Sequence, residues 1–478
     1  MTAKDRRDGI PLLVVDLDGT LIRSDMLFES FWAGLSENWQ AIPAALRGLA
    51  RGRAALKRSL ADVASLEVEH LPYNEIVLDY IRDWRASGGR AVLVTASDQS
   101  IADRIAAHLD LFDEVHGSNG EVNLKGHTKA EMIRERFGGT GYAYIGDSAA
   151  DIPVWQGARH AVTMDAPAVL RRRLAEVGKE TENLDSGVVP AYVAALRPHQ
   201  WLKNILVFVP VIAAHATDPV VLLKAVLAFA AFSLVSSSGY VLNDLMDLRA
   251  DRTHPRKSQR PLASGRVPIA HGTLMVPLLL LAGLALAAVG GMPLLAVIGA
   301  YFVLTTLYSF FLKQIAVADI CTLAGLYTMR IIAGGLATGL APSVWLLAFS
   351  IFFFVALAAI KRQAELVDLV RRGMPAARRR GYHVDDLPLV AQMSTASGYV
   401  SVMVLALYLN SPAVQELYTT PWLLWGICLV VLYWITRIAL ITSRGQMDDD
   451  PIVFAMRDRT SIVCILFMAC FVAGAALI

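Results

Sequence analysis

Hydrophobic and polar positions follow two different patterns along the chain. In the N-terminal part, short apolar runs at 10–15, 91–97 and 142–146 each lead directly into polar residues, and helical patterns lie between them. Short buried strands that alternate with helices predict an α/β domain with a doubly wound parallel sheet. The carboxyl ends of parallel strands meet at one edge of such a sheet, so we expect the polar residues to gather there.

The second half of the chain has longer apolar runs, close to the length that crosses a bilayer. They predict an all-α, polytopic membrane bundle of nine transmembrane helices. The expected spans are 201–214, 220–242, 272–290, 292–311, 316–338, 343–361, 393–410, 421–442 and 460–478.

Charge divides the chain in the same way. Residues 1–199 hold 23 Lys and Arg against 28 Asp and Glu, whereas residues 200–478 hold 21 against 14. The averages of 55% hydrophobic and 18% charged residues therefore describe neither part. This excludes one uniform globular domain, a disordered chain and a fibrous one. We expect a soluble multi-helix and sheet domain at 1–188 and a membrane domain at 189–478.

The positive charges predict an orientation. The loop at 243–271 and the segment 361–380 hold six and seven Lys or Arg, and the connections on the opposite side hold none. Cytoplasmic loops carry this excess, and the start of the chain has no apolar signal segment. We expect a multi-pass protein of the cell inner (cytoplasmic) membrane, with the soluble domain and the basic loops on the cytoplasmic side.

The polar residues after the first two predicted strands suit phosphoryl transfer to a carboxylate. Asp16 follows the first strand and can attack phosphorus, provided that a cation offsets the repulsion between the two anions. Asp18 can protonate the leaving oxygen and then activate water. Thr95 and nearby backbone N–H groups can hold the phosphoryl oxygens.

Further residues could bring positive charge to the same edge, either by binding a metal cation or as a lysine side chain. Asp147 and Asp151 follow the third strand and can ligate or orient Mg²⁺, which prefers hard oxygen ligands. Lys129 can neutralise the aspartate and phosphate charges; Lys125 competes for this role, but a helical sequence follows Lys129 directly. The expected ligands of the ion are Asp16, Asp18, Asp147 and Asp151.

These segments resemble the haloacid dehalogenase superfamily. DLDGT, the strand-terminal Thr95, Lys129 and GDSAAD stand in the order of its four motifs, over about residues 8–185. Asp18 matches the general acid/base of the phosphatases, so the resemblance implies an aspartyl-phosphate-type phosphatase. The helical segment at about 21–90 looks like the inserted cap of that family.

The membrane half carries an acidic motif at the end of its second predicted span. On a helix, Asp244, Asp247 and Asp251 stand at i, i+3 and i+7 and line one face. Three carboxylates repel one another unless a divalent cation joins them, which suits Mg²⁺ bound to a pyrophosphate. The alternative is a polar helix end that faces water. The cations expected to bind phosphate oxygens are Arg252, Lys257 and Arg260.

Other ionisable residues lie within or beside the predicted spans. Arg330 is deep in the fifth span and Asp319 is near its start, and an intramembrane arginine is by default a functional-site hypothesis. Lys361, Arg362 and Glu365 form a second charged cluster at the end of the sixth span, although an i,i+4 Lys–Glu pair is commonly structural.

The membrane half resembles the UbiA-type prenyltransferase superfamily over about 190–478. The segments LRPHQWLKN, NDLMDLRAD and YSFFLK fit that superfamily, as do nine spans with cytoplasmic catalytic loops. The resemblance implies further substrate-binding residues. They are Lys203, Asn243, Tyr308, Lys313, Arg457 and Arg459.

The usual second motif of that superfamily, DxxxD, is absent, and KRQAEL stands at 361–366 instead. With DDPIVFAMRDR at 449–459, this is similar to the branch that makes polyprenyl-phosphoryl 5-phosphoribose from polyprenyl phosphate and phosphoribosyl pyrophosphate. We therefore expect an Mg²⁺-dependent bifunctional enzyme whose phosphatase removes the 5-phosphate of the lipid product.

Two alternatives stay open. One is transfer of a prenyl group from a prenyl diphosphate to an aromatic or other small acceptor, beside an independent phosphatase. The other is a transporter or binding scaffold with a regulatory phosphatase. The expected partners of the enzyme are a polyprenyl phosphate lipid, phosphoribosyl pyrophosphate or a prenyl diphosphate, and membrane lipids, with no nucleic acid.

Overall fold

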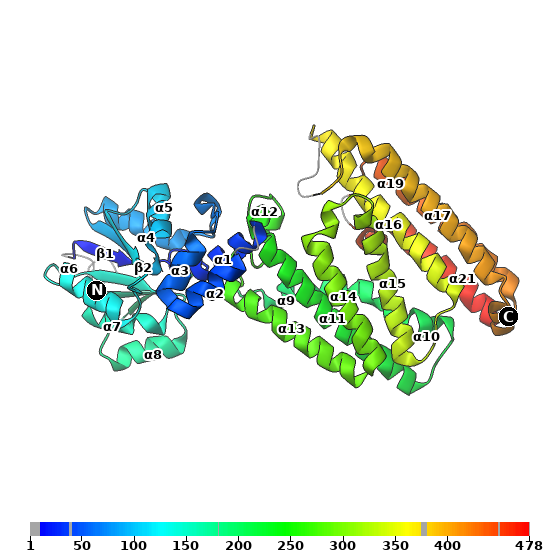
Figure 1. Cartoon of the computed structure of the whole chain (residues 1–478), viewed down its shortest axis with the longest axis horizontal. Coiled ribbons are helices and arrows are strands. Elements are labelled where there is room, and N and C mark those ends of the chain that lie inside the picture. The colour runs from blue at the N-terminus through cyan, green and yellow to red at the C-terminus, as the bar shows by residue number, and fades with distance from the viewer. Residues whose placement is uncertain (1–9, 38–40, 180, 374–379, 448–449, 478) are drawn as a thin grey trace. The chain divides into compact units, whose positions relative to one another are not determined.

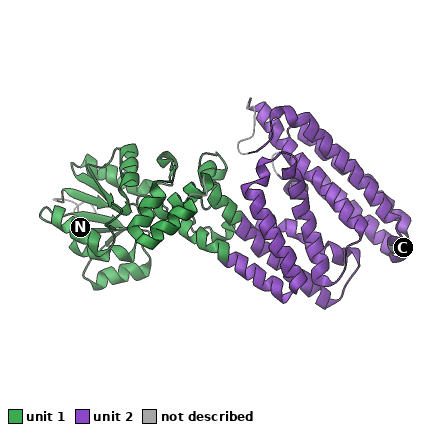
Figure 2. Cartoon of the chain, viewed as in Figure 1, with its two compact units in different colours: residues 1–196, 240–277 green, residues 197–239, 278–478 purple. Residues whose placement is uncertain are grey.

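The structure of the protein is a computed structural model that describes residues 10–37, 41–179, 181–373, 380–447 and 450–477. Arg378, Arg379 and Asp449, which contribute to the segments considered above, lie outside the described residues. The chain divides into two compact units (Figure 2): unit 1 holds residues 1–196 and 240–277, and unit 2 holds 197–239 and 278–478.

Unit 1 contains a six-stranded sheet in which all pairings are parallel, in the order β3-β2-β1-β4-β5-β6. The predicted parallel sheet is therefore confirmed. The strands are β1 (Leu12–Val15), β2 (Arg90–Asp98), β3 (Glu114–Ser118), β4 (Ala143–Gly146), β5 (His160–Met164) and β6 (Thr181–Leu184).

Helices cover both faces of this sheet (Figure 1). Those that follow β1 are α1 (Met26–Glu37), α2 (Ala41–Arg51), α3 (Arg53–Ala61) and α4 (Glu75–Ala86). Those that follow the later strands are α5 (Gln99–Leu109), α6 (His127–Phe137), α7 (Ile152–Gly157), α8 (Ala168–Glu176) and α9 (Tyr192–Ala195), with short 3₁₀ turns at Val68–His70 and Ala149–Asp151.

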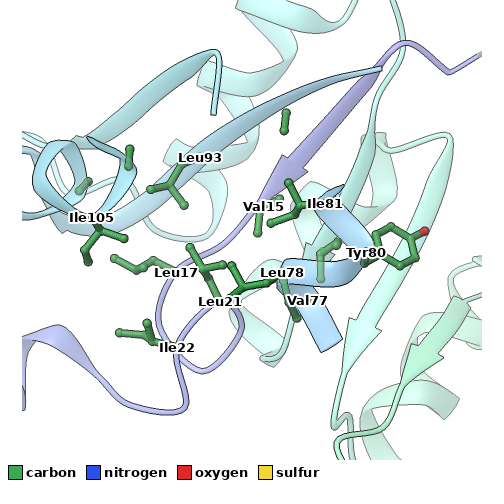
Figure 3. Packing of buried hydrophobic residues seen from close by; sticks show 14 of the residues in the cluster. Val15, Leu17, Leu21, Ile22, Val77, Leu78, Tyr80, Ile81, Leu93 and Ile105 are labelled. Carbon is green, nitrogen blue, oxygen red and sulfur yellow. The ribbon is translucent and has the colours of Figure 1, made fainter. Parts of the chain in front are cut away.

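The four residues of β1 are all buried, because successive side chains of a strand point to opposite faces and both faces are covered. Leu13 and Val15 pack with α4 and α5, where Figure 3 shows Val15 near Ile81 and Leu93 near Ile105. Leu12 and Val14 pack on the other face with side chains of α6, α7 and α8.

The order of the strands determines where a ligand can bind. The chain runs from β1 outward to β2 and β3, then returns to the other side of β1 with β4. This reversal opens a crevice at the carboxyl ends of the strands. Asp16, Ser97 and Asp147 follow or end the three neighbouring strands at that edge.

The described residues contain eight helices that are long and apolar enough to cross a membrane. Each corresponds to one predicted span. They are α11 (Pro219–Met246), α13 (Ile269–Val289), α14 (Met292–Phe310), α15 (Ala318–Thr338), α16 (Val344–Arg371), α17 (Leu387–Leu409), α19 (Trp425–Ser443) and α21 (Arg459–Leu477). The protein is therefore an integral membrane protein.

The shorter helices of this half lie between these spans. They are α10 (Val209–Ala213), α12 (Leu248–Arg252), α18 (Pro412–Leu417) and α20 (Pro451–Arg457), with 3₁₀ segments η3 (Pro198–Phe208), η4 (Lys257–Gln259), η5 (Leu312–Gln314), η6 (Val384–Asp386) and η7 (Pro421–Leu424).

The predicted span at 201–214 is not a helix of membrane length. Its residues form η3 and then the five-residue α10, so a bundle of nine spans is not confirmed. Pro210 near the start of α10 lacks the N–H that would continue the hydrogen-bonding pattern. By contrast, α16 continues ten residues past the predicted end of the sixth span, so Lys361, Arg362 and Glu365 are helical.

Candidate active sites

The first candidate site lies at the carboxyl edge of the sheet in unit 1. Asp16 is 7% exposed, and its Oδ1 lies 2.8 Å from Nζ of Lys129 on α6. The same ammonium lies 3.6 Å from Oδ1 of Asp151 and donates to the hydroxyl of Tyr144 at 3.0 Å. Burial lowers the pKa of Lys129, but the charges of Asp16 and Asp151 outweigh it and raise the pKa overall. Lys129 therefore remains a cation beside the candidate nucleophile, whereas Lys125 is exposed.

Asp18 is held by two donors. Its Oδ1 accepts the backbone N–H of Met26, the first residue of α1, at 2.7 Å, and its Oδ2 accepts the hydroxyl of Ser97 at 2.6 Å. Burial, and next the charge of Asp25, raises the pKa of Asp18 to about 7. A carboxyl group with this pKa can both give and take a proton near neutral pH, as a general acid and base must.

Three carboxylates converge where a cation is expected. Oxygens of Asp16, Asp147 and Asp151 all lie within 4.8 Å of one another, and no other such set occurs among the described residues. Burial, and next the charge of Asp16, raises the pKa of Asp147 well above its usual range. A divalent cation would relieve this repulsion. Asp18, also predicted as a ligand, lies outside the set.

Gly19 shows why the DLDGT segment needs its glycine. Its φ is +72°, and a Cβ at this position would lie 2.3 Å from Oδ2 of Asp147. Any other residue would strain the backbone and displace a carboxylate of the candidate metal site. The turn after β1 therefore brings Asp16 and Asp147 to the same point.

The remaining predicted residue and one unpredicted residue lie on or against β2. Thr95 is fully buried, and its Oγ1 accepts the N–H of Ser97 at 3.0 Å. Lys57 on α3 donates to the carbonyl of Ala96, between those two residues, and to Oδ1 of Asn123 at 3.2 Å. Burial lowers the pKa of Lys57, which was not among the predicted site residues.

The second candidate site is the acidic motif that follows the membrane-spanning part of α11, also in unit 1. The expected continuous helix is interrupted, because α11 ends at Met246 and Asp247 precedes α12 with φ −99° and ψ 11°. Oδ2 of Asp247 accepts the side-chain amide of Asn243 at 3.0 Å. The three aspartates are therefore not one uniform helical stripe.

Asp244 and Asp251 nevertheless face a common partner. Both are buried, and Nη1 of Arg260 lies 3.1 Å from Oδ1 of Asp244 and 2.5 Å from Oδ2 of Asp251. Burial raises the pKa of Asp251 to about 6, against the opposing charge of Arg260. A positive charge thus joins two carboxylates where a cation was expected. Lys257 in η4 is exposed and also lowers the pKa of Asp251.

Arg252 does not have the environment expected of a phosphate-binding residue. Its Nη1 and Nη2 donate to the two carboxylate oxygens of Glu29 at 3.0 and 2.6 Å, and its Nε donates to the carbonyl of Ala263 at 3.2 Å. All three guanidinium nitrogens therefore have protein partners. Sequence spacing did not show this contact, because Glu29 lies 223 positions away.

Unit 2 holds two charged clusters. In the first, Oδ2 of Asp450 lies 2.8 Å from Nζ of Lys203 on η3 and 3.1 Å from Nζ of Lys361 on α16. Burial raises the pKa of Asp450, but Lys361 and Lys203 together hold it well below its usual range. Asp450 was not among the predicted site residues, since only the fold places it between these lysines.

The second cluster surrounds the buried guanidinium of Arg362. Its Nη2 donates to Tyr308 on α14 and to Asp319 on α15, both at 3.0 Å, and its Nη1 lies 2.5 Å from Glu365. Arg380, which the sequence suggested only as a topology signal, lies 3.5 Å from Asp319 and 3.6 Å from Glu365. The predicted residues of α14, α15 and α16 therefore come together.

Other predicted residues have different partners from those of the two clusters or lie on short segments. Arg330 is 3% exposed and bonds to Asn204 at 2.8 Å, to Tyr301 at 2.9 Å and to the carbonyl of Leu326, which accounts for its burial as a helix-packing element. The rest lie on short segments or helix ends. Lys313 is partly buried in η5, and Arg457 and Arg459 are exposed at the junction of α20 and α21.

The fold and the two sets of residues define a hydrolase-like domain joined to a membrane transferase. The family model of the UbiA prenyltransferase family matches residues 204–477, and that of haloacid dehalogenase-like hydrolases matches residues 13–156. The chain therefore belongs to the UbiA prenyltransferase family, with a haloacid dehalogenase-like domain in its N-terminal part.

Relatives extend this assignment. The uncharacterized protein y4nM of Sinorhizobium fredii is 40% identical over 454 residues, which is 94% of this chain and 88% of that protein. Nodulation protein NoeC of Azorhizobium caulinodans is 38% identical over 278 residues, 58% of this chain and 91% of NoeC. Decaprenyl-phosphate phosphoribosyltransferase of Corynebacterium glutamicum is 36% identical over 197 residues, 40% of this chain and 58% of that enzyme.

Proposed function

We propose that the membrane domain transfers 5-phosphoribose from phosphoribosyl pyrophosphate to a polyprenyl phosphate, and that the N-terminal domain removes the 5-phosphate of the product. The charged end of α16 carries this proposal. It presents Lys361, Arg362 and Glu365 where most of the superfamily has an aspartate pair, and the similarity to decaprenyl-phosphate phosphoribosyltransferase supports the same reading.

The charges suit a reaction between two anionic substrates. Asp244 and Asp251 would take the pyrophosphate end through Mg²⁺, with Arg260 turning from the carboxylates to the phosphate oxygens. Lys203 and Lys361 would bind either the 5-phosphate of the ribose or the phosphate of the lipid acceptor. An oxygen of the lipid phosphate then attacks C1 of the ribose as its bond to pyrophosphate breaks. No protein nucleophile is needed, because positioning and charge neutralisation carry this step.

The N-terminal site suits hydrolysis of the resulting monoester. Asp16 attacks phosphorus, and Asp18 gives its proton to the ribose 5-oxygen as that oxygen leaves. Asp18 then takes a proton from the water that hydrolyses the aspartyl-phosphate. Lys129 holds Asp16 in place and offsets its charge.

The residues present fit a bound Mg²⁺. Asp16, Asp147 and Asp151 would hold it, since hard oxygen ligands converge there, and burial together with the charges of Asp16 and Asp151 raises the pKa of Asp147 in the absence of a compensating cation. When bound, the ion offsets the negative charge of the phosphoryl group. We further propose that the protein lies in the cell inner membrane with both sites on the cytoplasmic side. The loop at 243–271 and the segment 361–380 hold the excess of Lys and Arg that is typical of cytoplasmic loops.

A membrane assay with labelled phosphoribosyl pyrophosphate and polyprenyl phosphate tests the transfer. We expect labelled lipid from the wild-type chain and a loss of at least about 10²-fold with Asp244→Asn, because a carboxylate that holds the donor contributes several kcal/mol to the transition state. Glu416→Gln, an exposed change on α18, is the matched control and should retain activity.

Two results would contradict the proposal. If no labelled lipid forms while a prenyl diphosphate donates its prenyl group to a small acceptor, the domain is a prenyltransferase of the ordinary kind. If Asp244→Asn leaves the lipid product unchanged, the acidic motif has no part in transfer, and a transporter or scaffold becomes the better explanation.

A further inference from the structure

Helix α1 of the N-terminal domain makes contacts with both candidate sites of unit 1. Its first residue, Met26, donates its N–H to Asp18. One helical turn later, the carboxylate of Glu29 accepts hydrogen bonds from Nη1 and Nη2 of Arg252 at 3.0 and 2.6 Å. Figure 1 shows α1 beside α12, the helix that carries Asp251 and Arg252. The phosphatase domain therefore holds the acidic motif of the membrane domain directly.

The ion pair is buried, so water cannot replace either partner if the two side chains separate while the segment stays in place. The side chains of Arg252 and Glu29 are 8% and 3% exposed. Removing one partner of a buried pair leaves an uncompensated charge, so the segment must move or rehydrate when the pair is broken. Since Asp251 is the preceding residue of α12, any such movement changes its distance to Arg260 and Asp244.

Two further contacts confine the same region. Gly265 has φ +73°, and a Cβ there would lie 2.7 Å from Cβ of Arg23 in the turn that follows Asp18. Nε1 of the buried Trp32 on α1 donates to Oγ1 of Thr273 near the start of α13 at 2.8 Å. The loop between α12 and α13 and the first turns of α13 thus both pack against the phosphatase domain.

We propose that Glu29 is a positioning residue for the transfer reaction, although it belongs to the phosphatase domain. Through Arg252 it fixes the segment that carries Asp251, so binding of the pyrophosphate end of the donor depends on the phosphatase domain. The inference rests on the proposed role of Asp244 and Asp251 in holding that pyrophosphate. It gives the fusion a physical purpose beyond bringing two enzymes together.

The test compares Glu29→Gln with wild type in the purified full-length chain. We expect kcat/KM for the pyrophosphate donor to fall at least tenfold through a higher KM, while KM for the lipid acceptor stays within twofold. Hydrolysis of p-nitrophenyl phosphate should also stay within twofold, because Asp18 is held by the backbone of α1 and not by Glu29. Asp79→Asn, which breaks an exposed ion pair with Arg82, is the matched control and should change neither activity.

A double-mutant cycle with Arg252→Gln shows whether the pair acts as a unit. We expect kcat/KM for the pyrophosphate donor in the double variant to be no lower than in the less active single variant, because both changes break the same contact. An unchanged KM for the donor in Glu29→Gln, additive losses in the cycle, or an equal fall of both activities would each overturn the inference. If wild type uses a prenyl diphosphate instead of phosphoribosyl pyrophosphate, the proposed function fails, and the same comparison with that donor still decides the role of Glu29.

Discussion

Replacing Lys129 by methionine removes the only cation in direct contact with the candidate nucleophile among the described residues. Its ammonium lies 2.8 Å from Asp16 and 3.6 Å from Asp151, and the side chain is 2% exposed. Removing one partner of a buried pair costs about 3–5 kcal/mol. If this cost falls on the transition state, kcat/KM for phosphate monoesters drops by about 10²- to 10⁴-fold, since each 1.36 kcal/mol is a factor of ten.

The assay is hydrolysis of p-nitrophenyl phosphate by the purified chain, with Lys125→Met as the control. Lys125 is the other lysine that the sequence allowed at this position, and it is exposed. We expect the control to lose less than about threefold, because a solvated charge contributes little. Equal losses in the two variants, or a Lys129→Met chain with near-normal activity, would refute the assigned role.

Four further results follow from contacts in the two units. The pKa of Asp18 is raised to about 7, so the acid form is lost above that pH, and kcat for esters with poor leaving groups should fall there. Asp25→Asn removes a charge that raises this pKa and should move the fall to lower pH in a pH–rate profile. Lys57→Met should lower kcat/KM for phosphate esters about tenfold, as measured by steady-state kinetics, because its ammonium borders the site. Asp450→Asn leaves two lysines without their shared carboxylate and should destabilise the chain by about 3 kcal/mol, seen as earlier thermal unfolding in detergent.

Much of the first site follows from chain order alone. Short apolar runs fix where strands end, and parallel strands end at one edge, so the positions of Asp16, Thr95 and Asp147 relative to the sheet follow from their place in the chain. The eight membrane helices are similarly evident, because a bilayer requires long apolar runs. The predicted span at 201–214 was wrong because apolar composition alone does not show that the segment forms a 3₁₀ run followed by a short helix with Pro210 near its start.

Contacts between residues far apart in the chain could not be predicted from the sequence. Nothing in the spacing of Arg252 indicates that Glu29 would neutralise it, and the phosphate-binding role expected for Arg252 conflicts with this pairing. Arg330 was a functional candidate because an intramembrane charge is costly, but hydrogen bonds to Asn204 and Tyr301 account for that charge. For Arg330 the cost of burial was recognised from the sequence, whereas for Arg252 it was not. For both residues only the fold shows which partner offsets the charge.

The order of the two proposed reactions is tested most directly by the mass of the lipid that the purified chain makes from phosphoribosyl pyrophosphate and polyprenyl phosphate. Wild type should yield polyprenyl-phosphoryl ribose, and Asp16→Asn should accumulate the same lipid with its 5-phosphate retained, because only the phosphatase nucleophile is lost. Formation of dephosphorylated lipid by Asp16→Asn, or retention of the 5-phosphate by wild type, would contradict the account.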